Sequence, residues 1–233
     1  MPNNPPSSRL AFAYAGLIIA LCTSGCDWAT TTEKSNASQS IAHHSHAEHY
    51  SSVVRLHRSQ DPATPVVPGA KATLLTNRNG ARMTFHTNGL EPGHVYTVWW
   101  AIINAPDNCA TSPCTAADIF FNTAAVEADL TYAAGHLVGG SGKGHFAGHV
   151  SAGELPGSWY SNGFTNPQGA EIHLILNHHG PAIPGQVANQ TSTYRGGCTD
   201  ESLPPPVPET ARADGIPGPN TCELFQFAIF EQP

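Results

Sequence analysis

Charged residues are scarce in this chain of 233 residues. They make up 12% of it, with 10 Lys and Arg against 17 Asp and Glu, for a net charge of −7. Nucleic acids and anionic membrane surfaces are bound by clustered Lys and Arg, which this composition does not supply. We therefore expect no nucleic-acid partner.

The sequence also lacks the motifs of several enzyme classes. It contains no Gly-x-Ser-x-Gly, the plainest sign of a serine hydrolase. The glycine-rich run 139–144 does not have the spacing of a phosphate loop, because Lys143 is followed by glycine. Acidic residues are scattered, so no pair of carboxylates can be nominated for acid–base catalysis. We expect no nucleotide cofactor.

The longest hydrophobic run, residues 10–21, has 12 residues, fewer than the roughly 18 that span a bilayer. It follows Arg9 and ends in small residues before Cys26, as in a bacterial lipoprotein signal. We predict that residues 1–26 are a signal peptide and that Cys26 is lipidated, which would anchor an exported protein to a membrane of the cell envelope. A soluble secreted protein and an uncleaved anchor are the alternatives.

Residues 27–63 are rich in Ser, Thr, Ala and His and show no apolar periodicity, so we expect a disordered tether. Residues 64–233 consist of short hydrophobic stretches separated by Gly and Pro, which favours strands. The predicted fold is one all-β domain, an antiparallel β-sandwich or closed barrel of about seven or eight strands. The expected strands are 80–88, 94–104, 117–121, 126–138, 144–151, 170–177 and 222–230.

Two of these stretches carry informative patterns. In residues 80–88, Met83 and Phe85 share one face, and polar side chains occupy the other. Residues 94–104 are apolar on both faces, which predicts a central strand. The proline-rich segment 199–220 cannot lie inside a sheet and is expected to be a surface loop.

Four cysteines follow the predicted signal peptide. An even number in an oxidising compartment indicates disulfides. We favour one pair closing a tight loop and another stapling the proline-rich segment to the last strand; the alternative is a four-cysteine zinc site, whose usual short spacings are missing. The favoured pairs are Cys109–Cys114 and Cys198–Cys222.

Histidine is unusually frequent, with 13 residues. Neutral imidazole is a ligand for copper and zinc. A cluster in the tether can bring several imidazoles onto one ion, although a solvated polar tract is the alternative. Its members are His43, His44, His46 and His49.

The domain histidines suggest a second metal site. His145 and His149 cannot share an ion from one strand, because four residues span about 13 Å. His173 lies on the strand face opposite the core side chains, and a turn can fold His179 back toward His173 or toward a neighbouring strand. A buried, hydrogen-bonded histidine is the alternative at each position. The predicted ligands for copper or zinc are His136, His173, His178 and His179.

Three runs resemble a group of exported bacterial proteins with no assigned activity. They are residues 89–100, 133–144 and 169–185. The likeness covers most of residues 66–230, and its runs contain His136, His173 and His179. The Ile-His…His-Gly-Pro-Ala run is also similar, more weakly, to chordin-type β-domains of bacterial extracellular proteins, which implies an all-β fold.

Three functions follow from these features. The leading hypothesis is a non-enzymatic, lipid-anchored protein that captures copper or zinc through histidines. The second is a module that binds glycans or another envelope protein through exposed aromatic side chains. The third is a metal-dependent hydrolase with Glu171 as the base beside His173. The aromatic candidates are Trp159, Tyr160, Trp99 and Trp100.

Overall fold

The computed structural model describes residues 47–57, 63–203 and 205–232. The predicted signal peptide with Cys26, and the tether histidines His43, His44 and His46, lie outside these residues. Within the described ranges, no helix is long and apolar enough to cross a membrane.

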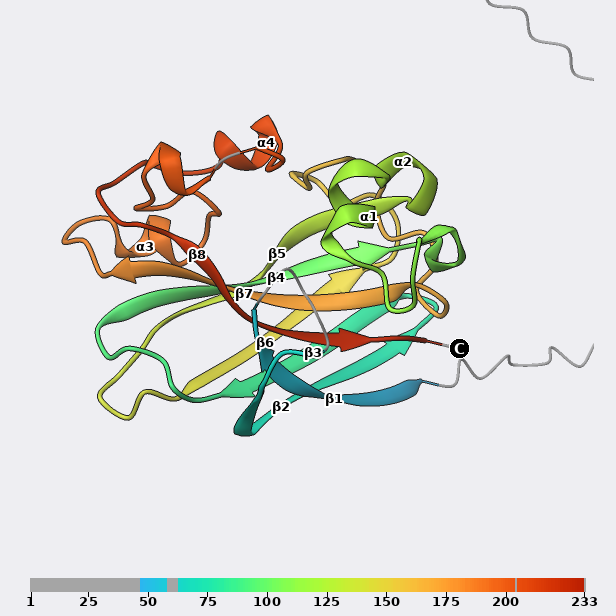
Figure 1. The fold of residues 1–233 in the computed structure, drawn as a ribbon, viewed down its shortest axis with the longest axis horizontal. Coiled ribbons are helices and arrows are strands. Elements are labelled where there is room, and N and C mark those ends of the chain that lie inside the picture. Colours follow the sequence, from blue (N-terminus) through green and yellow to red (C-terminus); the bar gives the residue numbers. More distant parts are fainter. Residues whose placement is uncertain (1–46, 58–62, 204, 233) are drawn as a thin grey trace, which may run out of the picture. The chain divides into compact units, whose positions relative to one another are not determined.

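Eight strands make up the sheet. They are β1 Glu48–Leu56, β2 Val66–Asn77, β3 Gly80–Thr87, β4 His94–Ile103, β5 Ala128–Leu137, β6 Gly144–Ser151, β7 Glu171–Pro181 and β8 Glu223–Phe230. They pair antiparallel in the order β5-β4-β7-β8-β1-β2-β3-β6 and curl into a nearly closed barrel (Figure 1). The edge strands β5 and β6 lie against each other, since a Cβ on Gly148 would stand 3.0 Å from the carbonyl oxygen of Ala133. The all-β prediction is confirmed.

The main hydrophobic core fills the barrel. Phe85 of β3, Trp100 of β4 and Leu174 of β7 are all 0% exposed within it. The alternation predicted for β3 is also present, because Met83 is buried on the inner face and Arg82 is exposed on the outer face.

One side of the barrel is also buried on its outer face. Trp99 and Ile103 of β4 and Ile175 of β7 pack there in a second hydrophobic cluster. Because β4 lies between β5 and β7 and is buried on both faces, the prediction of a central strand is confirmed. Short helices lie over this side (Figure 1). The helical segments are η1 Pro106–Asn108, α1 Ala116–Phe121, α2 Thr123–Val126, α3 Val187–Gln190, η2 Asp200–Ser202 and α4 Glu209–Arg212.

Two disulfides hold the loops that cover the barrel. Cys109–Cys114 closes the turn before α1, and Cys198–Cys222 joins the proline-rich segment to the start of β8, as predicted. That segment lies outside the sheet and packs Leu203 and Ala211 into the second cluster. Disulfides persist in oxidising compartments and are rare in the cytosol, so the presence of these two disulfides is typical of extracytoplasmic proteins.

Part of the segment predicted as a tether belongs to the barrel. Residues 48–56 form β1, which lies between β8 and β2. Only Val54 in this strand is buried, at 0% exposure, so its sequence carries a weak hydrophobic signal. The strand is held instead by its ladder with β2, which runs from Glu48 to Arg55.

The strand expected at 117–121 is wrong, because these residues form α1. The backbone N–H and the hydroxyl of Thr115 both donate to the carboxylate of Asp118, at 2.8 and 2.9 Å. This arrangement stabilises the first turn of a helix. A short apolar run fits a helix or a strand equally well, and here the cap decides.

Candidate functional site

Strand β7 continues to Pro181, and this separates the predicted histidine ligands. His173 and His179 share the outer face but stand six residues apart, which corresponds to roughly 20 Å at about 3.3 Å per residue. The turn expected to fold His179 back toward His173 does not occur there. His178 precedes His179 in the strand, so its side chain points to the other face, into the barrel interior. Its ring stacks on that of Tyr96, with the ring centroids 4.6 Å apart.

His178 is joined to another histidine at the end of the barrel. Its Nε2 lies 2.8 Å from Nδ1 of His94, and the rings are within 16° of parallel with centroids 5.1 Å apart. These distances place the rings edge to edge, so each nitrogen points at the other in an N–H···N hydrogen bond rather than at a shared ion. Burial and the neighbouring His94 lower the pKa of His178. His136, also predicted as a ligand, packs edge-on against Phe146, with the ring centroids 5.9 Å apart.

His173 forms a buried pair with Glu171. Its Nε2 lies 2.5 Å from Oε1 of Glu171, which also accepts the N–H of Cys114 at 2.8 Å. The side chains are 0% and 3% exposed. The contact expected between this acid and this histidine is therefore present. Among the described residues, neither belongs to a group of three metal-ligating side chains.

One group in the described part of the chain has the spacing of a metal site. Nitrogen and sulfur atoms of His179, Cys198 and Cys222 lie within 4.8 Å of one another, and all three residues are buried. The group can hold a metal ion, although its two cysteines are joined as a disulfide. It contains one of the four histidines predicted for the domain site; His136, His173 and His178 lie apart from it. The tether histidine His49 lies on β1, exposed and opposite Leu75.

Hydrogen bonds determine which ring nitrogen of His179 carries a proton. Trp99 Nε1, which can only donate, donates to Thr97 Oγ1 at 2.8 Å, and this hydroxyl lies 2.8 Å from Nε2 of His179. Nδ1 of His179 lies 2.9 Å from the carbonyl oxygen of Gly196, which can only accept. The bond to Gly196 therefore places a proton on Nδ1. Burial lowers the pKa of His179 to about 4, so the ring is neutral at physiological pH.

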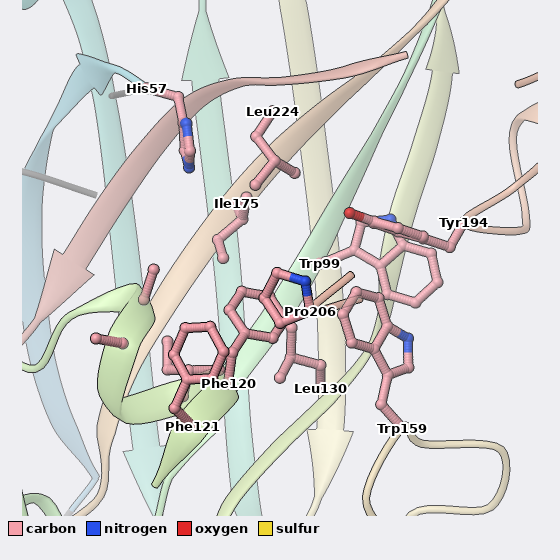
Figure 2. A pocket seen from close by; sticks show the side chains of 13 residues that line it. His57, Trp99, Phe120, Phe121, Leu130, Trp159, Ile175, Tyr194, Pro206 and Leu224 are labelled. Atoms are coloured by element: carbon pink, nitrogen blue, oxygen red, sulfur yellow. The ribbon is translucent and has the colours of Figure 1, made fainter. Parts of the chain in front are cut away.

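A cavity of about 370 Å³ opens beside this network, on the outer face of the barrel. Its floor includes Trp99 of β4 and Ile175 of β7, and one wall is α1 with Phe120 and Phe121. Figure 2 shows Trp99, Trp159 and Tyr194 grouped toward one end and His57 at the other. The side chain of Phe121 is 76% exposed.

The cavity is apolar, and two of the residues that line it each carry a buried nitrogen without a hydrogen-bond partner. Nε2 of His57 and Nε1 of Trp159 are buried and have no hydrogen-bond partner among the described residues. Burial lowers the pKa of His57 to about 4, so the ring is neutral at physiological pH. No Asp, Glu, Lys or Arg of the described residues lines the cavity.

The sequence pointed to part of this cavity for a different reason. Trp99 and Trp159 were among the aromatic candidates, yet they are 3% and 5% exposed and face a concavity instead of forming an exposed patch. His57 was not predicted, because it lies within the segment expected to be a tether. The cavity walls come from distant parts of the chain, so spacing alone could not reveal them.

Comparison of the chain with protein families, with curated proteins and with solved structures finds no match. The resemblance to exported bacterial proteins and to chordin-type domains stays a prediction.

Proposed function

We propose that this domain is an extracytoplasmic binding protein that holds a small, uncharged, largely apolar molecule in the cavity beside α1. The observation that carries the proposal is a cavity lined almost wholly by aromatic and aliphatic side chains, with His57 and Trp159 among them. Its volume of about 370 Å³ falls within the range of about 300–1,000 Å³ typical of small-molecule sites, which are mostly apolar with a few polar groups.

The lining defines the chemistry of the ligand. A flat ring of the ligand can pack against Phe120 and the Trp99–Trp159 pair, because aromatic side chains favour offset or edge-to-face contacts with other rings. A hydroxyl or amide on the ligand would supply the partner that Nε2 of His57 lacks. A charged group would find no counter-ion, and a glycan would leave most of its hydroxyls unpaired at a cost of about 1–3 kcal/mol each.

A matched pair of tryptophan substitutions tests the site. Ala117 is exposed on α1 and lines the cavity, so Ala117→Trp fills it. Ala124 is exposed on α2 away from the cavity, so Ala124→Trp is the control. With the uncharged probe N-phenyl-1-naphthylamine, followed by fluorescence, we expect Ala117→Trp to weaken binding at least about tenfold, or about 1.4 kcal/mol. Equal binding by both variants would contradict the proposal.

The role of His57 is tested in the same assay. We expect 1-naphthol to bind more tightly than naphthalene by about fivefold, since a neutral hydrogen bond contributes about 1 kcal/mol. His57→Phe keeps an aromatic ring but removes Nε2, so it should abolish this preference while naphthalene binding persists. A preference for 1-naphthol that survives in His57→Phe would show that another group makes the contact.

Capture of copper or zinc is a second candidate function, supported by the grouping of His179, Cys198 and Cys222. A disulfide sulfur carries no negative charge, and Nδ1 of His179 already holds a proton donated to Gly196. A thiol reductant that delivers two electrons and two protons converts the disulfide into two thiols. Metal binding then releases the two thiol protons, and the imidazole proton moves from Nδ1 to Nε2, where Thr97 Oγ1 can accept it. The two thiolates and Nδ1 form a three-ligand set with a fourth position open. We therefore infer that metal binding at this group requires reduction.

Cobalt(II) is a suitable probe, because its bonds to thiolate give charge-transfer absorption. In a Cys109→Ser, Cys114→Ser variant, only Cys198 and Cys222 of the domain remain as thiols after reduction. We expect one cobalt ion with thiolate absorption in the reduced variant and none in the oxidised one. The control is the same variant with Cys198→Ser and Cys222→Ser added, which leaves no thiol in the domain and should show none in either state. Absence of thiolate absorption from the first variant after reduction would rule out this candidate.

A further inference from the structure

Two histidines lie side by side on the exposed face of the barrel. His86 of β3 is paired directly with His145 of β6 in an unbroken antiparallel ladder from Gly80 to Thr87. Both side chains are exposed. Their ring centroids are 4.7 Å apart, and the rings are inclined at 79°. Neither residue contributes to the cavity or to the group around the second disulfide.

The geometry across strands differs from that along one strand. Directly opposite residues have Cβ atoms about 4.5–5.5 Å apart, so their imidazoles can reach one ion. His149 stands farther along β6, opposite Arg82, and has no imidazole across the ladder. The partner of His145 is thus on the neighbouring strand, which the spacing of histidines along the sequence does not show.

The ladder also fixes the two histidines before an ion binds. Residues in a paired strand have already lost their backbone freedom on folding, whereas a free segment loses about 1–2 kcal/mol per residue when it is ordered. On its other side, β3 is paired with β2, and the residue of β2 directly across from His86 is Lys71. The paired positions therefore offer imidazole nitrogens and no carboxylate, which favours borderline transition metals over Mg²⁺ or Ca²⁺.

We propose that His86 and His145 form a two-imidazole site for Cu(II) on the outer face of β3 and β6. Among divalent first-row metals Cu(II) binds such ligands most tightly, and its tetragonal geometry accepts two adjacent nitrogens with water at the remaining positions. The site is independent of the cavity ligand and of the state of the disulfides.

Titration of the oxidised, full-length mature chain with Cu(II) tests the site, with electron paramagnetic resonance as the readout of nitrogen ligation. We expect His86→Asn and His145→Asn each to lose one bound Cu(II) relative to the natural chain. The double variant should lose no more than either single one, because the two imidazoles share an ion. His149→Asn, exposed on the same strand, is the control and should bind as the natural chain does.

Histidines elsewhere in the chain are present in all four variants and cancel in the comparison. Unchanged Cu(II) stoichiometry in both single variants would overturn the proposal. So would losses that add in the double variant, since additive losses mean two separate imidazole sites. All these positions are exposed on paired strands, so substitution leaves the buried core intact.

Discussion

At the scale of single residues, His179 shows how a histidine can be part of the packing and remain neutral. Its ring is 0% exposed and makes hydrogen bonds on both nitrogens, to Thr97 and to Gly196. The chain Trp99–Thr97–His179 links the cavity floor to the disulfide region. The alternative considered for each domain histidine, a buried and satisfied ring, describes His179 in the disulfide form.

The lowered pKa of His179 predicts a pH dependence of stability. An imidazole of the unfolded chain takes up a proton near pH 6.5, but His179 in the folded chain does so only near pH 4. The unfolded state therefore binds more protons between these values, and stability falls as the pH is lowered from 6.5 to 4. Above pH 6.5 the contribution is complete. The expected loss is about 3 kcal/mol.

Urea unfolding at pH 7.5 and pH 4 measures this loss, and His179→Gln should show a smaller one. His57 has a pKa lowered in the same direction, so its contribution is common to both proteins and cancels. An NMR titration of His179 gives an independent check, with an expected midpoint near pH 4. A midpoint near 6.5, or equal losses in both proteins, would contradict the assignment.

For single residues, the sequence predicted which face of a strand a side chain occupies better than which residues it contacts. Alternation along 170–177 correctly placed His173 and Leu174 on opposite faces of the strand. The contact of His173 with Glu171 followed from the face that these two residues share. The surroundings of His179 could not be foreseen, because Gly196 and Cys198 reach it from a later loop. The cysteine pairs were predicted correctly, since compartment and loop length favour them without knowledge of the fold.

At the scale of elements, one glycine holds β5 against the loop that covers it. A Cβ on Gly135 would stand 1.9 Å from the carbonyl oxygen of Thr191, which also accepts the hydroxyl of Tyr132 at 2.8 Å. We expect Gly135→Ala to lower the free energy of unfolding by about 1–3 kcal/mol, the usual cost of overpacking. Urea denaturation measures the change.

Gly139 provides the matched control for this substitution. It follows β5, and a Cβ there would meet nothing within 4 Å. Gly139→Ala should therefore change stability by less than about 0.5 kcal/mol. If the two variants were equally stable, the close approach of β5 to this loop would not be a constraint on the fold.

Elements with a strong hydrophobic pattern were predictable, and those held by other forces were not. Strands β3, β4 and β6 follow the expected ranges because burial on one or both faces requires hydrophobic side chains at regular positions, which the sequence shows. Strand β1 buries little and depends on its ladder, while α1 depends on the capping interaction of Thr115 with Asp118. Short segments stabilised by backbone pairing or by a single cap carry little periodic signal.

At the scale of the whole molecule, the sequence did not distinguish a closed barrel from a β-sandwich. The difference rests on pairings between distant segments, above all β1 with β8, where Arg55 lies opposite Phe227. The cavity is a property of the same scale: its floor is sheet, and its walls are α1 and loops held by disulfides. The segment 10–26 predicted export and the Gly and Pro content predicted an all-β domain, but a concavity built from several loops has no linear signature.

The position of β1 has a mechanical consequence. This first strand is an interior member of the sheet, with β8 on one side and β2 on the other. If Cys26 is the lipid anchor, tension between membrane and domain enters the barrel through β1. Antiparallel hydrogen bonds run perpendicular to the strands, so a pull along β1 loads the pairs from Glu48 to Arg55 together instead of peeling them one at a time. The strand nearest the predicted anchor therefore cannot leave the sheet without breaking its pairing with both β8 and β2.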